Sequence, residues 1–306
     1  MASQVWFITG VSSGFGLLLA LRALASGQRV IGTVRSTAKS TDAVRQITSA
    51  GGRVVELDMT DSQAQILAKV KDAENIYGQI DVLVNNAGYS ILGAIEQFSE
   101  EETELQFRTN VYGPLFTTQG VLPGMRARRR GCIVNMSSGA GQDAGATRGL
   151  YGASKFALEG LSEALSAEVA EFGVTVLLVE PGMFRTNFFH ALQTPRAPLP
   201  EAYRGGAGAG AGATTAVGRI MDMFDRLTGT QRGDPQKAAD RIYEVVAGEE
   251  RLSAGAGAGG PLLGRVLRLP LGMDAIDRVE AKQRRVLAEV AEARRLEEYE
   301  STAFPN

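Results

Sequence analysis

The feature that most constrains the fold is a series of short apolar runs that alternate with helix-like segments. The runs lie at residues 5–9, 29–34, 53–58, 81–88, 132–138 and 174–182, and residues 265–272 suggest a short last one. They are nearly all apolar instead of alternating, as in strands buried on both faces of a parallel sheet. The pattern predicts an α/β, doubly wound Rossmann-type fold, with a parallel seven-stranded sheet flanked by helices.

Two Gly/Ala-rich tracts interrupt this pattern, at residues 205–216 and 253–260, and both resemble flexible loop insertions. The first lies inside a segment, about 183–234, that we expect to form a substrate lid. A charged stretch at about 274–299 carries apolar residues at helical spacing and predicts an amphipathic C-terminal helix, either of the domain or of a subunit contact. We see no domain boundary and expect one domain over residues 1–306.

Composition excludes several classes of function. The net charge is −2, from 32 Lys and Arg and 34 Asp and Glu, so we expect neither nucleic acid nor an anionic membrane as a partner. The single cysteine, Cys132, and the single histidine, His190, exclude a disulfide framework and Cys- or His-rich metal sites. We find no signal peptide and no apolar run of membrane-spanning length, and therefore expect a cytoplasmic protein.

A glycine-rich turn lies between the first apolar run and the first helix-like segment. It contains Gly10, Ser12, Ser13, Gly14, Phe15 and Gly16. Glycines there permit a tight turn and let the backbone approach a pyrophosphate, which the free N–H groups and dipole of the helix N-terminus favour. The alternative is a glycine turn without a ligand, which the flanking strand and helix make a poor explanation.

The second chemical signal is the pair Tyr151 and Lys155, four residues apart on a predicted helix. Residues at that spacing share one face of a helix. A nearby ammonium group favours the phenolate, so we expect the pKa of Tyr151 to be lowered and the phenol to act as a general acid or base. Such pairs also occur on exposed helices, so the pair alone proves little.

Taken in order, the motifs TGxxxGxG and YxxxK, with NNAG at 85–88, Asn110, Ser138 and PG at 181–182, resemble the classical short-chain dehydrogenase/reductase family. The resemblance covers roughly residues 3 to 250. TGVSSGFG, YGASKFALEG and GDPQKAA are similar to the branch that contains hydroxysteroid- and retinol-dehydrogenase-like reductases. The resemblance to the family implies a catalytic set of Asn110, Ser138, Tyr151 and Lys155. Ser138 is preferred to Ser137 because it lies thirteen residues before Tyr151, the usual family interval.

The resemblance also implies a nicotinamide cofactor and its contacts. Asp58 would bond the adenine, Asn86, Ala87 and Gly88 would line the ribose side, and Pro181, Gly182 and Thr186 would embrace the nicotinamide. Val34 stands where NAD enzymes carry an acid, and Arg35 follows it, with Ser36 and Thr37 as hydroxyl donors. An Arg can fork onto a 2′-phosphate, so we expect NADP(H); a plain surface arginine is the alternative.

These observations predict an NADP(H)-dependent oxidoreductase that interconverts a carbonyl and a secondary alcohol. Aromatic and Met residues in the lid segment suggest a bulky hydrophobic ketone, unless they simply pack the lid. The first rival is a non-catalytic NADP-binding regulatory protein on the same fold. An extended-type epimerase would need GxxGxxG, and a purely structural oligomer leaves the motifs unexplained. The family implies a homodimer or homotetramer, formed through the helices after strands four and five.

Overall fold

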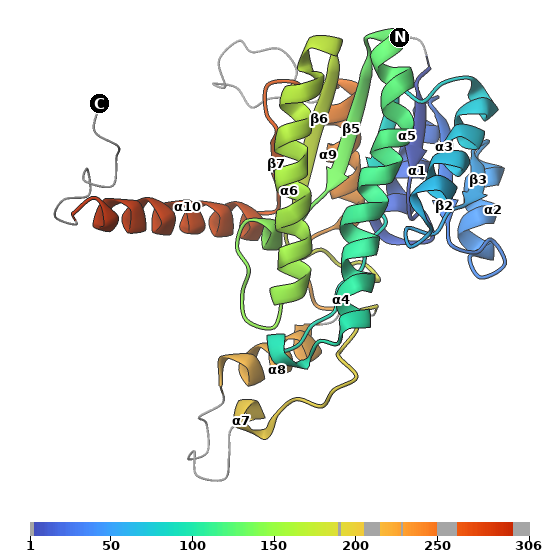
Figure 1. Cartoon of the computed structure of the whole chain (residues 1–306). Helices are drawn as coiled ribbons and strands as arrows, with labels where there is room; N and C mark the ends of the chain where they lie inside the picture. The colour runs from blue at the N-terminus through green and yellow to red at the C-terminus, as the bar shows by residue number, and fades with distance from the viewer. Residues whose placement is uncertain (1–2, 189–190, 205–214, 228, 250–261, 296–306) are drawn as a thin grey trace.

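The sheet dominates the architecture. The protein is described by a computed structural model that covers residues 3–188, 191–204, 215–227, 229–249 and 262–295. Seven strands form one parallel sheet in the order β3-β2-β1-β4-β5-β6-β7, which confirms the predicted α/β fold (Figure 1). The strands are β1 (Val5–Ile8), β2 (Arg29–Val34), β3 (Arg53–Glu56), β4 (Val82–Asn85), β5 (Gly131–Met136), β6 (Val174–Pro181) and β7 (Arg268–Leu271).

The continuous apolar character of the strands has a direct structural reason. Side chains alternate between the two faces of a strand. In β1, Trp6 and Ile8 join one buried cluster, whereas Val5 and Phe7 join the cluster on the opposite face. Because helices cover both faces, every position of the strand has to be apolar.

The helices divide between these two clusters. α1 (Gly14–Ala25), α2 (Thr41–Ser49) and α9 (Pro235–Ala247) contribute to the first, and α3 (Gln63–Tyr77), α5 (Gly113–Arg128) and α6 (Gly149–Val169) contribute to the second. Four short turns and four other helices complete the described chain. They are η1 (Ile95–Gln97), α4 (Glu100–Phe107), η2 (Arg108–Tyr112), η3 (Gly139–Gly141), η4 (Ala170–Phe172), α7 (Glu201–Arg204), α8 (Ala216–Leu227) and α10 (Met273–Ala293).

The strand order reverses next to β1, which pairs with β2 on one side and with β4 on the other. At such a switch point the loops that follow neighbouring strands diverge to opposite faces, and a crevice opens at the carboxyl ends. Three predicted strands extend two or three residues too far at this end: β3 ends at Glu56, β4 at Asn85 and β5 at Met136. The chain passes into loops beyond these ends, and these loops contain the predicted site residues Asp58, Asn86, Ala87, Gly88 and Ser138.

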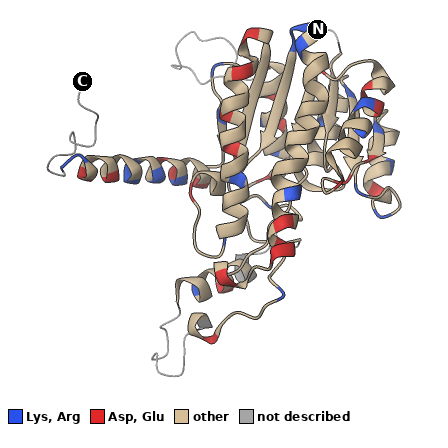
Figure 2. Cartoon of the chain, in the orientation of Figure 1, with Lys and Arg blue, Asp and Glu red and all other residues tan. Residues whose placement is uncertain are grey.

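The two predicted appendages lie outside the sheet. α7 and α8 of the expected lid lie beyond the site end of α6, whereas α10 projects away from the body (Figure 1). Charged side chains of both signs run along α10 (Figure 2), and its apolar Leu287 and Val290 are exposed. The helix begins one residue before the predicted start, and residues 296–299 of the prediction lie outside the described chain. So do residues 205–214 and 253–260 of the Gly/Ala tracts, as well as His190.

Candidate active site

The glycine turn between β1 and α1 is packed too tightly to admit side chains. Gly10 has φ +72°, and a Cβ on it would lie 2.8 Å from the Cα of Ala87. A Cβ on Gly16 would lie 2.4 Å from Asn86 Nδ2 and from the Gly10 carbonyl oxygen. Asn86 closes the turn by donating from Nδ2 to the carbonyl oxygens of Thr9 and Gly10 at 2.9 and 3.0 Å.

The start of α1 has the chemistry of an anion site. Its N-cap residue, Ser13, makes no capping side-chain hydrogen bond within the described chain. The N–H groups of the first helical turn are therefore not occupied by a cap and, with the helix dipole, favour a negative group. A glycine cradle without room for a Cβ, followed by an uncapped helix start, fits the pyrophosphate of a dinucleotide. The residues present therefore suit the expected nicotinamide cofactor.

The predicted adenosine contacts lie at the ends of β2 and β3. Arg35 is exposed immediately after the buried Val34, and Ser36 follows it. Thr37, which we expected to be a free hydroxyl donor, instead donates from its N–H and its hydroxyl to Glu56 Oε1 at 2.7 and 2.8 Å. These bonds lower the pKa of Glu56, which lies in β3 opposite Val34 of β2. Glu56 therefore carries a negative charge beside the predicted adenosine contacts. We did not predict this charge from the sequence. Asp58 uses Oδ1 to accept hydrogen bonds from Thr60.

The loop after β6 returns to the glycine turn. A Cβ on Gly14 would lie 3.7 Å from Thr186 Cβ, so the predicted nicotinamide loop lies directly against the phosphate turn. Phe184 packs edge-on against Phe15 at 5.4 Å between ring centroids. Gly182 follows Pro181 and faces the carboxylate of Asp274, which accepts a hydrogen bond from the Met183 N–H at 2.7 Å. Asp274, in the first turn of α10, had no signal in the local sequence.

Three of the predicted catalytic residues come together at the carboxyl end of the sheet. Lys155 is buried and donates from Nζ to the carbonyl oxygen of Met136 at 2.7 Å. Its Nζ lies 5.8 Å from the centroid of the Tyr151 ring, one turn earlier on α6. A Cβ on Gly88 would lie 3.1 Å from Asn110 Oδ1 and 3.7 Å from Lys155 Nζ, so Gly88 leaves room between the two side chains.

Asn110 is held in place by an irregular turn. It belongs to η2, a single π-helical turn between α4 and α5, a type of turn that often marks functional sites. Its Oδ1 accepts a hydrogen bond from the Tyr89 N–H, and its Nδ2 donates to the Tyr89 carbonyl oxygen and to Ser154 Oγ at 3.0 Å each. The amide is fully buried, so these bonds fix its orientation toward Lys155.

The electrostatics of Tyr151 differ from our expectation. Burial raises the pKa of Tyr151, whereas the hydrogen bond with the Ser138 side chain and the positive charge of Arg148 lower it by less. The expected lowering by Lys155 is therefore wrong for the protein by itself, because that ammonium group is turned to the Met136 carbonyl oxygen. Burial also lowers the pKa of Lys155 to about 8.

Arg148 is a site residue that sequence reasoning missed. It lies three residues before Tyr151, and its Nε is buried without a hydrogen-bond partner in the described part of the chain. Its charge reaches Tyr151 because Arg148 is the N-cap residue of α6, three residues before the tyrosine, and its backbone pairs with Gly93. Ser137, the alternative to Ser138, has a buried hydroxyl that faces Gly141, so the structure brings Ser138, not Ser137, to the phenol.

Other chemistries find little support in the described residues. Within them no group of three or more His, Cys, Asp or Glu side chains could hold a metal ion. Cys132 is buried, and burial raises the pKa of its thiol to about 12, as expected for an inert core cysteine. None of the helices in the described ranges is long and apolar enough to cross a membrane.

Comparisons with known proteins agree on one family. The family model described as short chain dehydrogenase matches residues 4–197. The oxidoreductase claN of Passalora fulva is 44% identical over 201 residues, which are 65% of this chain and 90% of that protein. Retinol dehydrogenase 8 of Homo sapiens is 35% identical over 193 residues, 61% of each chain.

Solved structures extend the likeness to almost the whole chain. A short-chain dehydrogenase from Streptomyces avermitilis superimposes with a TM-score of 0.77 at 38% identity and covers 95% of this chain and 96% of its own. A metagenomic short-chain oxidoreductase solved with NADP has a TM-score of 0.56 at 32% identity, over 60% and 85% of the two chains. A short-chain dehydrogenase/reductase from Burkholderia phymatum, solved with NAD, has a TM-score of 0.67 at 26% identity, over 80% and 86%.

Proposed function

Because the chain belongs to the short chain dehydrogenase family, and to its retinol-dehydrogenase-like branch, we propose that it is an NADP(H)-dependent carbonyl reductase that also oxidises the corresponding secondary alcohol. The observation that carries the proposal is the buried phenol of Tyr151, whose ring centroid lies 5.8 Å from the buried ammonium group of Lys155, one helical turn later on α6. A phenol in such a pocket can exchange a proton with a substrate oxygen. The glycine turn at the same end of the sheet supplies a place for the nucleotide.

The bound nicotinamide supplies or accepts the hydride. In reduction, Tyr151 protonates the substrate oxygen while the Ser138 hydroxyl holds that oxygen and stabilises its developing charge. The raised pKa of Tyr151 suits this direction, because it keeps the phenol protonated near neutrality. In oxidation the phenol has to lose its proton first, and the positive charge of Arg148 favours that step.

Lys155 and Asn110 replace the proton that Tyr151 gives up. With a pKa lowered to about 8, Lys155 can both donate and accept a proton close to physiological pH. We propose that Asn110 holds a water in the space beside Gly88, through which Lys155 exchanges protons with solvent. We propose that the Lys155 side chain also binds the nicotinamide ribose.

NADP(H) is proposed over NAD(H) on the strength of Arg35. A guanidinium group in solvent at the end of β2 can fork onto a 2′-phosphate, and Val34 offers no carboxylate for a ribose hydroxyl. The ionised Glu56, held by Thr37, lies at the end of the neighbouring strand and would repel a 2′-phosphate, so the proposal requires that Arg35 outweigh this charge. Structures of relatives were solved with either nucleotide, so the choice rests on this chain's own residues.

The substrate is proposed to be a bulky hydrophobic ketone. Phe188 lies 5.9 Å from Tyr151 between ring centroids, so an apolar side chain borders the reacting phenol. Tyr203, Met221, Met223 and Phe224 lie in the lid segment beyond it. One relative, retinol dehydrogenase 8, is named for retinol, which is a large apolar molecule.

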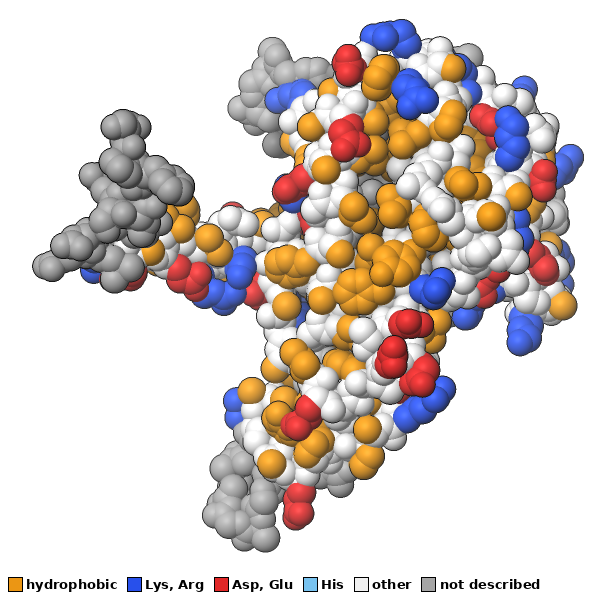
Figure 3. Space-filling view, viewed as in Figure 1, with side chains coloured by type: hydrophobic (Ala, Val, Ile, Leu, Met, Phe, Trp, Pro, Cys, Tyr) orange, Lys and Arg blue, Asp and Glu red, His pale blue; other side chains and the backbone are white. Residues whose placement is uncertain are grey.

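We also propose that two copies associate through α5 and α6. A cleft of about 220 Å³ lies between these helices, lined by residues that include Leu122, Leu165 and Phe172. Apolar side chains gather on the side of the molecule that carries α5 and α6 (Figure 3). α6 and the turn before α5 also expose Tyr112, Phe156 and Leu161. An apolar patch of this kind favours a self-association surface. The one-domain organisation and the cytoplasmic location stay predictions.

A substrate panel tests the proposal. Hydrophobic ketones are offered with NADPH and, separately, with NADH, and nucleotide oxidation is followed by absorbance. We expect ketone-dependent oxidation of NADPH and a loss of at least about a thousandfold in Tyr151→Phe, which removes only the proton donor. Nucleotide binding without turnover over the whole panel would instead favour the rival, a regulatory protein that binds NADP on the same fold.

A further inference from the structure

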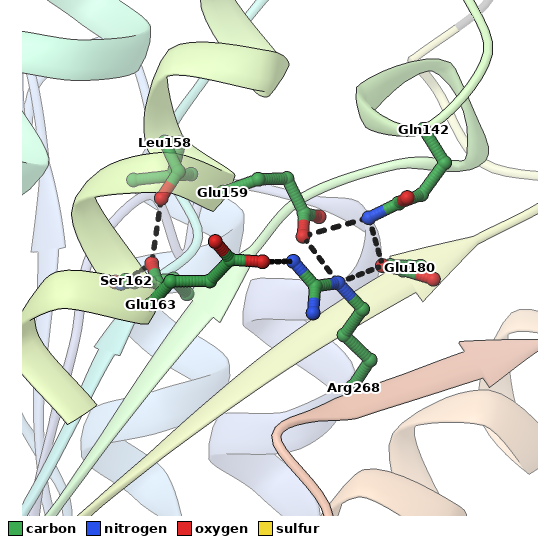
Figure 4. A network of polar contacts seen from close by, with 8 residues as sticks. Gln142, Leu158, Glu159, Ser162, Glu163, Glu180 and Arg268 are labelled. Atoms are coloured by element: carbon green, nitrogen blue, oxygen red, sulfur yellow. Dashed lines mark hydrogen bonds and ion pairs between the residues drawn. The ribbon is translucent and has the colours of Figure 1, made fainter. Parts of the chain in front are cut away.

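A network of charged side chains joins α6, β6 and β7 and contains two buried carboxyl groups (Figure 4). Arg268 of β7 donates from Nε to Glu159 Oε2 of α6 at 2.9 Å and lies 3.3 Å from Glu180 Oε1 of β6. Gln142 donates from Nε2 to the same two carboxylate oxygens at 3.0 and 3.1 Å. Glu159 is 4% exposed and Glu180 is fully buried. Two carboxyl groups are thus held together in a site with little access to water.

The hydrogen-bond donors of the network reach only one of the two carboxylate oxygen atoms on each of Glu159 and Glu180. Arg268 and Gln142 serve one oxygen of each carboxyl group, and Arg268 spends its Nη2 on Glu163. The other oxygens, Glu159 Oε1 and Glu180 Oε2, are buried without a hydrogen-bond partner in the described chain. Two ionised carboxylates at hydrogen-bonding distance of one guanidinium repel each other, so a proton shared by the pair is the stable state.

Of the two carboxyl groups, Glu180 is the one expected to take the proton. Burial and the neighbouring charge of Glu159 raise the pKa of Glu180 to about 7. Its partner, Glu159, accepts the shorter of the two contacts with Arg268 Nε, at 2.9 Å against 3.3 Å for Glu180. When one proton is shared by the pair, the carboxyl group closer to the guanidinium is the one that stays negative.

Glu159 lies on the same helix, α6, as the candidate catalytic residues Tyr151 and Lys155. Glu159 lies one turn after Lys155 on α6, and a Cβ on Gly141 would touch Glu159 Cγ and Lys155 Cβ at 3.2 Å each. The two side chains therefore share one wall of the site. Burial lowers the pKa of Lys155, and the charge of Glu159 is what opposes this lowering. Without Glu159, a buried ammonium next to an uncharged phenol would lose its proton more easily.

We propose that Glu159 is a positioning residue that keeps Lys155 charged, and that Glu180 carries the proton which leaves Glu159 ionised. The inference rests on the proposed function, in which a charged Lys155 returns the proton to Tyr151. The charged and titratable groups facing the network are Lys155 and Glu163 from α6, Glu180 from β6 and Arg268 from β7, with the neutral Gln142 after η3. Arg268 belongs to β7, the last strand of the sheet, and holds Glu159 in place by a hydrogen bond. The position of β7 therefore affects the charge of Lys155.

The test is a pH titration of the Lys155 side chain by NMR in the protein without substrate. Lysine is labelled with ¹³C and ¹⁵N, and the signal is assigned by its loss in Lys155→Met. In Glu159→Gln we expect the titration midpoint of Lys155 to fall by about one pH unit or more, since a charge one helical turn away is lost. Glu163→Gln is the matched control: it also removes a carboxylate from Arg268, but a turn further from Lys155 and at 57% side-chain exposure. It should leave the midpoint unchanged.

A second measurement keeps the inference open to refutation if Glu159→Gln does not fold. In the unmodified protein, ¹³C-labelled glutamate should show Glu180 titrating near neutral pH, with Glu159 as the charged member of the pair at pH 7. Glu159→Asp should keep the Lys155 midpoint within about half a unit, because the charge remains. A protonated Glu159 at pH 7, or equal Lys155 midpoints in Glu159→Gln and Glu163→Gln, overturns the inference.

The kinetic counterpart separates this inference from the proposed function. If ketones are reduced, the alkaline limb of the pH profile of kcat should move to lower pH in Glu159→Gln by the same amount as the Lys155 midpoint, with KM for NADPH little changed. If the protein reduces no carbonyl compound, the proposed function fails while the NMR titration still decides the charge relation. If the midpoint moves and the profile of an active enzyme does not, Glu159 has no positioning role.

Discussion

Replacing Gly10 by alanine should test how closely the backbone has to pack at the phosphate turn. Two costs arise. A residue with a side chain in the left-handed region, at φ +72°, costs roughly 1–2 kcal/mol. The added Cβ would also lie 2.8 Å from the Cα of Ala87, a backbone atom that cannot rotate away, and such overpacking typically costs about 1–3 kcal/mol. We therefore expect the free energy of unfolding to fall by about 2–5 kcal/mol.

Gly27→Ala provides the matched control. Gly27 has φ +78°, but a Cβ on it would meet nothing within 4 Å, so only the conformational cost applies. Unfolding in urea can be followed by fluorescence because the chain has one tryptophan, Trp6, which is fully buried in β1. Gly10→Ala should also weaken NADPH binding by at least about tenfold, because the turn has to shift away from Ala87, and Gly27→Ala should not. Equal losses of stability and unchanged binding in both variants would refute the close-packing argument.

Three further predictions address charge. Arg148→Met removes a positive charge beside Tyr151, so the pKa of the phenol should rise and alcohol oxidation should reach half its maximum about half a pH unit or more higher; an unchanged profile contradicts this. Arg35→Ser should raise the Kd for NADPH at least about tenfold with little effect on NADH, measured by fluorescence titration; an equal loss for both contradicts it. The pKa of Glu180 is raised from 4.5 to about 7, so the folded protein binds more protons than the unfolded chain between these values. The free energy of unfolding should therefore fall as pH rises through this window, by on the order of 3 kcal/mol, and Glu180→Gln should remove this dependence in urea titrations at pH 5 and 8.

Much of the fold could be read from the sequence because its signals are local. A run such as VWFI is apolar at every position only if both faces of the strand are covered, so the pattern itself indicates a parallel sheet with helices on both sides. The glycine turn could be recognised from one short motif between β1 and α1, although the atoms that exclude a side chain at Gly10 belong to Ala87, after β4. The placement of Tyr151 and Lys155 on one helical face follows from the period of the helix alone.

The tertiary structure decided how the site is charged. Tyr151 was expected to have a lowered pKa because Lys155 is its neighbour in the sequence, but burial dominates, and burial depends on everything packed around the phenol. The charge that does act on the phenol belongs to Arg148, the N-cap residue of α6, three residues before Tyr151. The spacing alone does not show which of the two neighbouring cations, Lys155 or Arg148, acts on the phenol.

The network that joins α6, β6 and β7 shows the same limit over a longer distance. Arg268 meets Glu159 across 109 residues of chain because β7 lies beside β6 in the sheet. Gln142 meets Glu180 across 38 residues because β5, which precedes Gln142, also pairs with β6. The sequence by itself determined which strands and helices form and which motifs lie at their ends, since these depend on short-range periodicity and backbone geometry. Which charges face one another, and which protons they keep, was decided by packing, because the energy of a buried charge depends on its distance to groups that are remote in sequence.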